Sequence, residues 1–131
     1  MIIDTHYHMI PQVGTKASRF MARWPFQHAE KLGIPVDFDT LASEIKDIAA
    51  DPAGEKLLAR MDETGIDITM FCAVDDCSIR GNTYDIVKDL NEKTASIAGR
   101  SPSRLVALAG IDPRRPEAPA LLTHCMDAVS Y

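Results

Sequence analysis

Three stretches of the chain have the apolar pattern of β-strands. Residues 2–7 open with two isoleucines and carry the β-branched Thr5, which predicts a short strand almost at the N-terminus. Residues 66–74 and 105–111 are nearly continuous apolar runs, bounded by Gly, Asp and Pro. Such runs are typical of strands that are buried on both faces of a parallel sheet.

Apolar residues spaced three to four positions apart predict four helices, around residues 41–48, 52–64, 83–98 and 116–128. Residues that commonly cap helices stand at their ends: Asp39 or Thr40, Asp51 followed by Pro52, Asn82 or Thr83, and the glycines Gly65 and Gly99. Two helices are therefore expected between the first and second strands, and one helix after each later strand.

Residues 9–39 have no sustained period, and Pro and Gly recur among them. This segment is predicted to be a long irregular loop, and loops of that length inside a compact domain are often functional. It carries an aromatic cluster of Phe20, Trp24 and Phe26, so we expect it either to pack against another part of the protein or to line a pocket.

The predicted order is strand, loop, two helices, strand, helix, strand, helix. Alternation of this kind indicates βαβ units, in which parallel strands are joined by right-handed crossovers. The expected fold class is therefore α/β with parallel strands, and residues 1–131 are expected to form one domain.

The composition is that of an ordinary globular domain, since 46% of the 131 residues are hydrophobic and 25% are charged. The formal net charge of −5 argues against a nucleic-acid surface or an anionic membrane as the partner. Arg114 and Arg115 form the only adjacent basic pair, which we interpret as the solvent-exposed start of a helix. No apolar run approaches the roughly 18 residues that a membrane span needs.

The three cysteines, Cys72, Cys77 and Cys125, indicate a reducing compartment. Their number is odd, no two have C-x-x-C spacing, and no secretory signal precedes the first predicted strand. We therefore expect a cytoplasmic protein. Cys72 lies within an apolar run and is predicted to be a core residue, whereas Cys77 is expected to be a free thiol in a loop.

The residues that point most directly to chemistry are His6 and His8, at the end of the first predicted strand. Because side chains alternate along a strand, Asp4, His6 and His8 are expected on one face. Two neighbouring imidazoles can ligate one cation, and neutral imidazole favours zinc, iron, nickel or manganese over calcium or magnesium. The two histidines are therefore the predicted metal ligands.

The opening run Asp4-Thr5-His6-Tyr7-His8 resembles the D-x-H-x-H signature of the amidohydrolase superfamily. Residues 58–67, 102–105 and 109–113 are similar to passages beside the second and third strands in its amidohydrolase-related branch. That branch holds aminocarboxymuconate-semialdehyde decarboxylase and resorcylate-type decarboxylases. The four stretches stand in the family's order and cover nearly the whole chain apart from residues 12–39.

The resemblance implies a metal-dependent hydrolase or decarboxylase with a TIM-type (β/α)8 barrel, a fold of about 250 residues. This chain would then be the N-terminal (βα)3 portion of the barrel, with His6 and His8 as ligands of a divalent metal, for which zinc is the best candidate. On the family pattern Asp4 is structural and makes hydrogen bonds near the first turn. The implied substrate is a small carboxylate, lactone or cyclic amide. The family's further ligands, a His after the fifth strand and an Asp after the eighth, have no counterpart here.

Several expectations follow from this incompleteness. The chain alone is expected to be inactive and either truncated or associated as a homo-oligomer through exposed sheet edges. His124 is predicted to lie on the surface of the last helix, and His28 in the long loop; neither is assigned as a metal ligand.

Two other functions stay open. A TatD-like metal nuclease has a similar opening motif, although its groove should gather Lys and Arg near the strand ends, which this sequence does not do. A non-catalytic α/β interaction module would contain the same strands without a metal. Phosphodiesterase activity and metal content distinguish these two alternatives from the hydrolase or decarboxylase.

Overall fold

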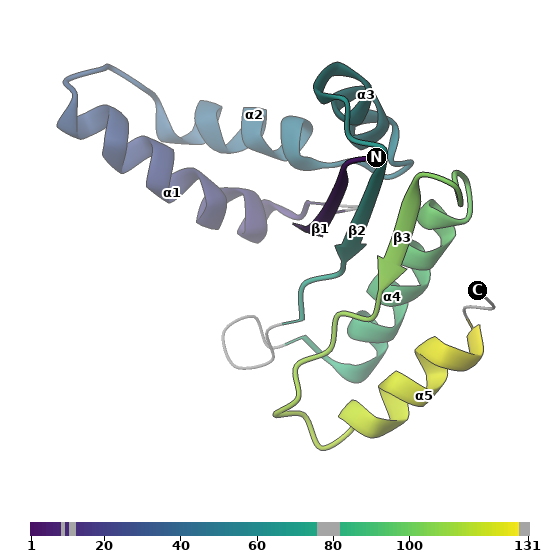
Figure 1. Ribbon diagram of the computed structural model, residues 1–131. Helices are drawn as coiled ribbons and strands as arrows, with labels where there is room; N and C mark the ends of the chain where they lie inside the picture. The colour runs from purple at the N-terminus through teal and green to yellow at the C-terminus, as the bar shows by residue number, and fades with distance from the viewer. Residues whose placement is uncertain (9, 11–12, 76–81, 129–131) are drawn as a thin grey trace. The chain divides into compact units, whose positions relative to one another are not determined.

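The computed structural model describes residues 1–8, 10, 13–75 and 82–128 (Figure 1). Contacts between residues divide the chain into two compact units. The first, here called the sheet unit, comprises Met1–Pro11 and Pro52–Tyr131, and the second, the two-helix unit, comprises Gln12–Asp51. None of the helices in the described part of the chain combines the length and the apolar character that a membrane crossing requires.

The described residues of the sheet unit form three strands, β1 (Ile3–His8), β2 (Ile68–Cys72) and β3 (Leu105–Leu108). They lie in the order β1-β2-β3 and both pairings are parallel, so the three arrows in Figure 1 point the same way. The predicted α/β fold with a parallel sheet is thus confirmed. Because the strands are parallel, their carboxyl ends lie at one edge of the sheet, where His8, Cys72 and Leu108 are in register.

The helices of the sheet unit, as far as the structure describes it, are α3 (Glu55–Thr64), α4 (Tyr84–Ala98) and α5 (Ala118–Ala128). Two predicted caps are confirmed, because Thr83 Oγ1 accepts a hydrogen bond from Ile86 N at 3.4 Å, and Gly65 ends α3 with a φ of 73°. The prediction that Asp51 caps α3 was wrong. The helix begins after Gly54, whose φ of 77° is a left-handed conformation that glycine adopts readily.

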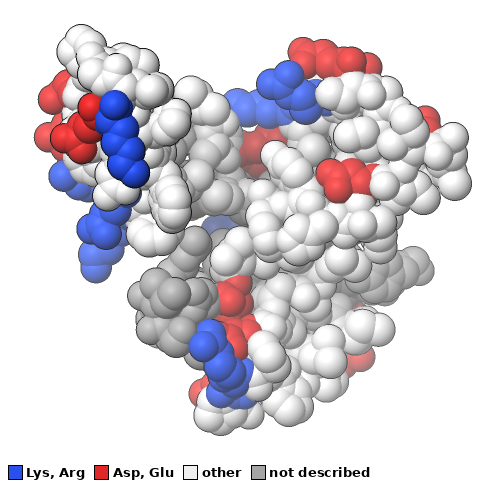
Figure 2. Space-filling model, turned by 60° about the vertical axis from the view of Figure 1, so that its left-hand side comes forward, with Lys and Arg blue, Asp and Glu red and all other residues white. Residues whose placement is uncertain are grey.

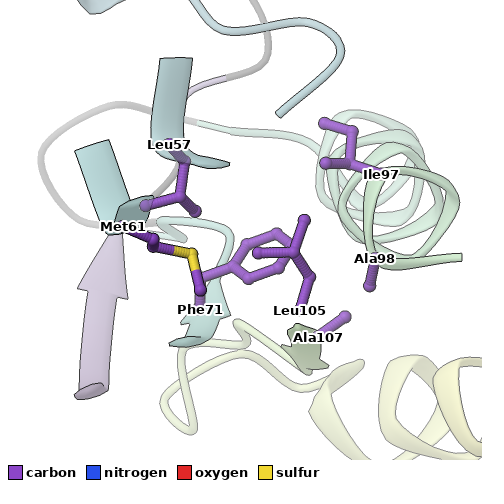
Figure 3. Close-up of a cluster of buried hydrophobic side chains, with 7 residues drawn as sticks. All are labelled: Leu57, Met61, Phe71, Ile97, Ala98, Leu105 and Ala107. Atoms are coloured by element: carbon purple, nitrogen blue, oxygen red, sulfur yellow. The ribbon is translucent and has the colours of Figure 1, made fainter. Parts of the chain in front are cut away.

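Helices α3 and α4 cover one face of the sheet and form the core of this unit with it (Figure 3). The core cluster comprises Leu57, Met61, Phe71, Ile97, Ala98, Leu105 and Ala107. Phe71 of β2 is completely buried, and Figure 3 places its ring between the side chains of α3 and those of α4. Full burial of such a side chain contributes about 1.5–3 kcal/mol to the stability of the fold. Because Phe71 packs against residues of both α3 and α4, the central strand β2 joins the two helices to the sheet.

The two-helix unit consists of α1 (Thr15–Lys31) and α2 (Phe38–Ala49). The prediction of an irregular loop over residues 9–39 was wrong, because α1 continues through Pro25. A proline inside a helix removes one hydrogen bond, but the neighbouring Ala, Arg, Met, Gln and Lys residues are strong helix formers. The helical conformation ends only near Gly33, whose φ is 68°.

The start of α2 also differs from the prediction. Asp37, rather than Asp39 or Thr40, is the N-cap, and its Oδ1 accepts hydrogen bonds from the N and the Oγ1 of Thr40, each at 2.8 Å. These bonds from Thr40 hold the pKa of the Asp37 carboxyl below its usual range. Phe38 then packs edge-on against Phe26 of α1, with ring centroids 5.2 Å apart, which is a favourable aromatic geometry.

The chain segments that follow β2 and β3 approach each other very closely. A Cβ placed on Gly110 would lie 2.0 Å from the carbonyl oxygen of Ala73, which is closer than real Cβ atoms come. The obstacle is backbone, so it cannot rotate aside as a side chain does. A residue without a Cβ is therefore required at position 110.

Gly110→Ala is expected to lower the free energy of unfolding by about 3 kcal/mol, because the new methyl group forces the two backbone segments apart. Gly99→Ala is the matched control, since a Cβ there meets carbonyl oxygens at an ordinary 3.6 Å. Its effect should stay below about 1 kcal/mol. Urea unfolding followed by circular dichroism measures both variants, and equal stability would contradict the close approach of Ala73 and Gly110.

Candidate metal centre

His6 and His8 stand at the carboxyl end of β1, and their rings lie side by side. The two Nε2 atoms are 3.1 Å apart, and the ring centroids are 4.6 Å apart at an interplanar angle of 85°. Both residues are exposed. The structure thus brings together the two residues that the sequence predicts as metal ligands.

A β-bulge in β1 decides which residues share a face with the histidines. The register shifts between Asp4 and Tyr7, which inserts one extra residue of β1 into the pairing. Asp4 is in register with Thr69 of β2, a fully buried residue on the helix-covered face. The prediction that Asp4 shares a face with His6 and His8 was therefore wrong, because strict alternation fails at the bulge.

Asp4 nevertheless has a local role in this strand. Its Oδ1 accepts a hydrogen bond from the backbone N of His6 at 3.1 Å, which confirms the expected local bonding. A bulge disrupts the hydrogen-bond ladder of a strand, so an acceptor two residues away stabilises the backbone at that point. Asp4 thus supports the histidine pair without facing it.

The other end of β1 is tied to β2 by Asp67. Its Oδ2 accepts a hydrogen bond from the backbone N of Ile2 at 2.6 Å and lies 3.6 Å from the N-terminal ammonium of Met1. The hydrogen bond from Ile2, together with the ammonium charge, lowers the pKa of the Asp67 carboxyl. These contacts help to hold the register that places His8 beside β2.

Cys72, which ends β2, lies beside the histidine pair. The prediction that it is a core residue was wrong, because it is only half-buried and its Sγ lies 3.4 Å from His8 Nδ1. Burial raises the pKa of the Cys72 thiol. The sequence could have identified Cys72 as a neighbour of His8 from its place at the end of the second predicted strand. The last residues of adjacent parallel strands lie side by side at the carboxyl edge of the sheet.

The spacing of the two imidazoles fits a shared metal ion. Nitrogens that ligate one zinc ion at about 2.0–2.1 Å with a near-tetrahedral angle lie roughly 3.3 Å apart, and the observed separation of the Nε2 atoms is 3.1 Å. His8 directs its Nδ1 at Cys72, so the thiol lies on the other side of that ring from Nε2. Within the described residues, no group of three His, Cys, Asp or Glu side chains is arranged to hold a metal ion.

A buried ion pair lies just beyond the same edge of the sheet. Asp75 follows β2, Arg115 precedes α5, and their side chains, 1% and 7% exposed, form two hydrogen bonds of 2.6 and 2.9 Å. Arg115 also donates to the carbonyl oxygen of Asn82, and Asp75 Oδ2 accepts from the backbone N of Asp112 at 2.9 Å. The prediction of an exposed basic pair was therefore wrong for Arg115, whereas Arg114 is exposed and bonded to Asp112.

The side chain of Asn91 connects α4 to the segment that follows β3 through hydrogen bonds. Its Nδ2 donates to the carbonyl oxygens of Val87 at 2.8 Å and Gly110 at 3.1 Å, and its Oδ1 accepts from the N of Gly110 at 2.8 Å. Sequence reasoning missed these buried polar contacts, because a polar residue in a helical pattern is ordinarily read as a surface position. They stabilise the edge of the sheet at which the strands end.

The other residues singled out from the sequence lie elsewhere. His124 is on α5, where its Nε2 is paired with a carboxylate of α4 at 2.8 Å. His28, Trp24 and Phe26 belong to helix α1 of the two-helix unit and not to a loop. Cys77 falls outside the residues that the structure describes.

An apolar pocket of about 310 Å³ lies between α4, β3 and α5. It is lined by Asn91, Ala95, Ala107, Leu108, Ala109, Leu122, Cys125 and Met126. Neither His6 nor His8 lines this pocket, so it is separate from the candidate metal centre.

Protein families and curated proteins give no further guide to this site. Comparison with models of protein families yields no match for the sequence, and comparison with curated proteins yields none either. The function of this site is therefore inferred from the geometry of His6 and His8 and from the strands that position them.

Asp75→Asn is expected to lower the free energy of unfolding by about 3–5 kcal/mol, because it leaves the buried guanidinium of Arg115 without its carboxylate. Asp89→Asn is the control, since Asp89 forms a 2.7 Å pair with Lys93 in which both side chains are about half exposed. That change should cost less than about 1 kcal/mol. Denaturant unfolding in parallel separates the two cases, and a similar small loss in both would contradict a stabilising buried pair.

Proposed function

We propose that this chain is the N-terminal part of a metal-dependent hydrolase or decarboxylase of the amidohydrolase type. His6 and His8 would hold a divalent metal ion, for which zinc is the best candidate, at the carboxyl edge of a parallel sheet. The observation that carries the proposal is the 3.1 Å separation of the two Nε2 atoms at that edge. In (β/α) barrels the active site lies at the carboxyl ends of the strands.

The donor set supports zinc over calcium or magnesium. Both candidate ligands are imidazole nitrogens, which suit zinc and other transition metals, whereas calcium and magnesium prefer oxygen. When bound, such an ion polarises a carbonyl group or lowers the pKa of a water molecule. Two nitrogens leave a tetrahedral site incomplete, so the remaining ligands would come from other residues of the intact protein.

The charge distribution supports a small molecule as the substrate. Within each of the two units, the Lys and Arg side chains that Figure 2 shows are interspersed with Asp and Glu. A nucleic-acid backbone requires several basic contacts along its path, whereas a small carboxylate, lactone or cyclic amide requires only a few. The proposed substrate is therefore one of these small molecules. The proposed compartment is the cytoplasm, for which the odd number of cysteines without C-x-x-C spacing is the support.

The purified chain should bind zinc through both histidines. His6→Ala and His8→Ala are each expected to weaken zinc binding by at least about tenfold, because a single imidazole remains. His28→Ala is the control, since it removes an exposed histidine of α1. Competition against a chromogenic chelator measures the affinities, and circular dichroism checks the fold. If His6→Ala and His8→Ala bind zinc as tightly as the His28→Ala control and the unmodified chain, His6 and His8 are not the zinc ligands.

A further inference from the structure

Cys72 makes a contact that metal ligation by the two histidines does not require. Its Sγ lies 3.4 Å from Nδ1 of His8, on the side of the ring opposite to the Nε2 that meets His6. Strand pairing also puts Cys72 directly opposite His8 in the register of β1 and β2. The pairing of β1 with β2 therefore determines that His8 and Cys72 lie next to each other.

The protons on the two rings restrict how this cluster can bind a metal. A neutral imidazole carries one N–H, and a nitrogen that ligates a metal must present its lone pair. The two Nε2 atoms are 3.1 Å apart, so in the absence of metal one of them donates a hydrogen bond to the other. A metal that binds both Nε2 atoms requires both rings to carry their proton on Nδ1.

The Cys72 thiol can form a hydrogen bond with Nδ1 of His8 whether the ring carries its proton on Nε2 or on Nδ1. When His8 carries its proton on Nε2, its Nδ1 can accept a hydrogen bond from the Cys72 S–H. When the proton is on Nδ1, that nitrogen donates to the sulfur, because a thiol is both a weak donor and a weak acceptor. The two arrangements are tautomers of the neutral His8 ring, so the change from one to the other neither gains nor loses a proton.

We propose that Cys72 is a positioning residue for the metal site, accepting a hydrogen bond from Nδ1–H of His8 and thereby directing Nε2 of His8 at the metal. This inference rests on the proposed function, because it concerns the same site. Histidine ligands commonly donate their second N–H to a partner that fixes the tautomer and the ring orientation. Here the partner is a thiol on the neighbouring strand, and it does not ligate the metal.

The test compares Cys72→Ala with Cys72→Ser and with the control Cys125→Ala, which removes the buried thiol of α5. Loss of such a partner commonly weakens metal binding by about 10–100-fold, and a weak sulfur acceptor favours the lower end. Cys72→Ala should thus weaken zinc binding about tenfold, while Cys72→Ser, whose hydroxyl also donates and accepts, should retain most of the affinity. Cys125→Ala should leave the affinity unchanged.

Two spectroscopic readouts separate positioning from other roles of the thiol. The ¹⁵N shifts of the His8 ring should change in metal-free Cys72→Ala, while those of His28 stay fixed, because only His8 loses a partner. The cobalt-loaded chain should show no thiolate-to-metal charge-transfer band that disappears in Cys72→Ala. Such a band, or wild-type zinc affinity and His8 shifts in Cys72→Ala, would overturn the positioning role.

The two proposals fail in different ways. Zinc binding that does not depend on His6 and His8 contradicts the proposed function. Zinc binding that depends on both histidines but is the same in Cys72→Ala contradicts only the positioning role of Cys72.

Discussion

The candidate site depends on how β1 pairs with β2. The pairing is parallel, so the ends of both strands lie at one edge, and the bulge within β1 changes which residues lie on each face. His8 is opposite Cys72 in the register, and its Nε2 lies close to Nε2 of His6. Asp4 stabilises the bulged backbone by accepting a hydrogen bond from the backbone N of His6. Alternation along β1 turns both imidazoles to the same face, and this register brings His8 beside Cys72 at the edge of the sheet.

Buried polar contacts hold the same edge of the sheet in place. The Asp75–Arg115 pair joins the segment after β2 to the segment before α5, and Asn91 joins α4 to Gly110. Burying charges is costly unless they are paired and hydrogen-bonded, and here both charges are paired. The rigid edge thus combines an apolar core on one face of the sheet with satisfied polar groups beyond the strand ends.

The sequence predicts the strands well because their signal is local. Apolar runs, Thr83 and Gly65 identify β2, β3 and the helix ends directly. Helix α1 was missed because Pro25 argues against a helix locally, whereas the surrounding helix formers outweigh it, and only the start of α2 was misplaced. At the site, His6 and His8 were recognisable from their spacing. The bulge, the Cys72 contact and the buried Arg115 were not, because each depends on residues far apart in the sequence.

The most direct measurement is a crystal structure of the chain with zinc, with the metal located by its anomalous scattering. We predict a zinc peak about 2.0–2.1 Å from Nε2 of both His6 and His8, with Nδ1 of His8 directed at Cys72. Rings on opposite sides of β1, or zinc bound only at other residues, would contradict a metal centre at this edge of the sheet.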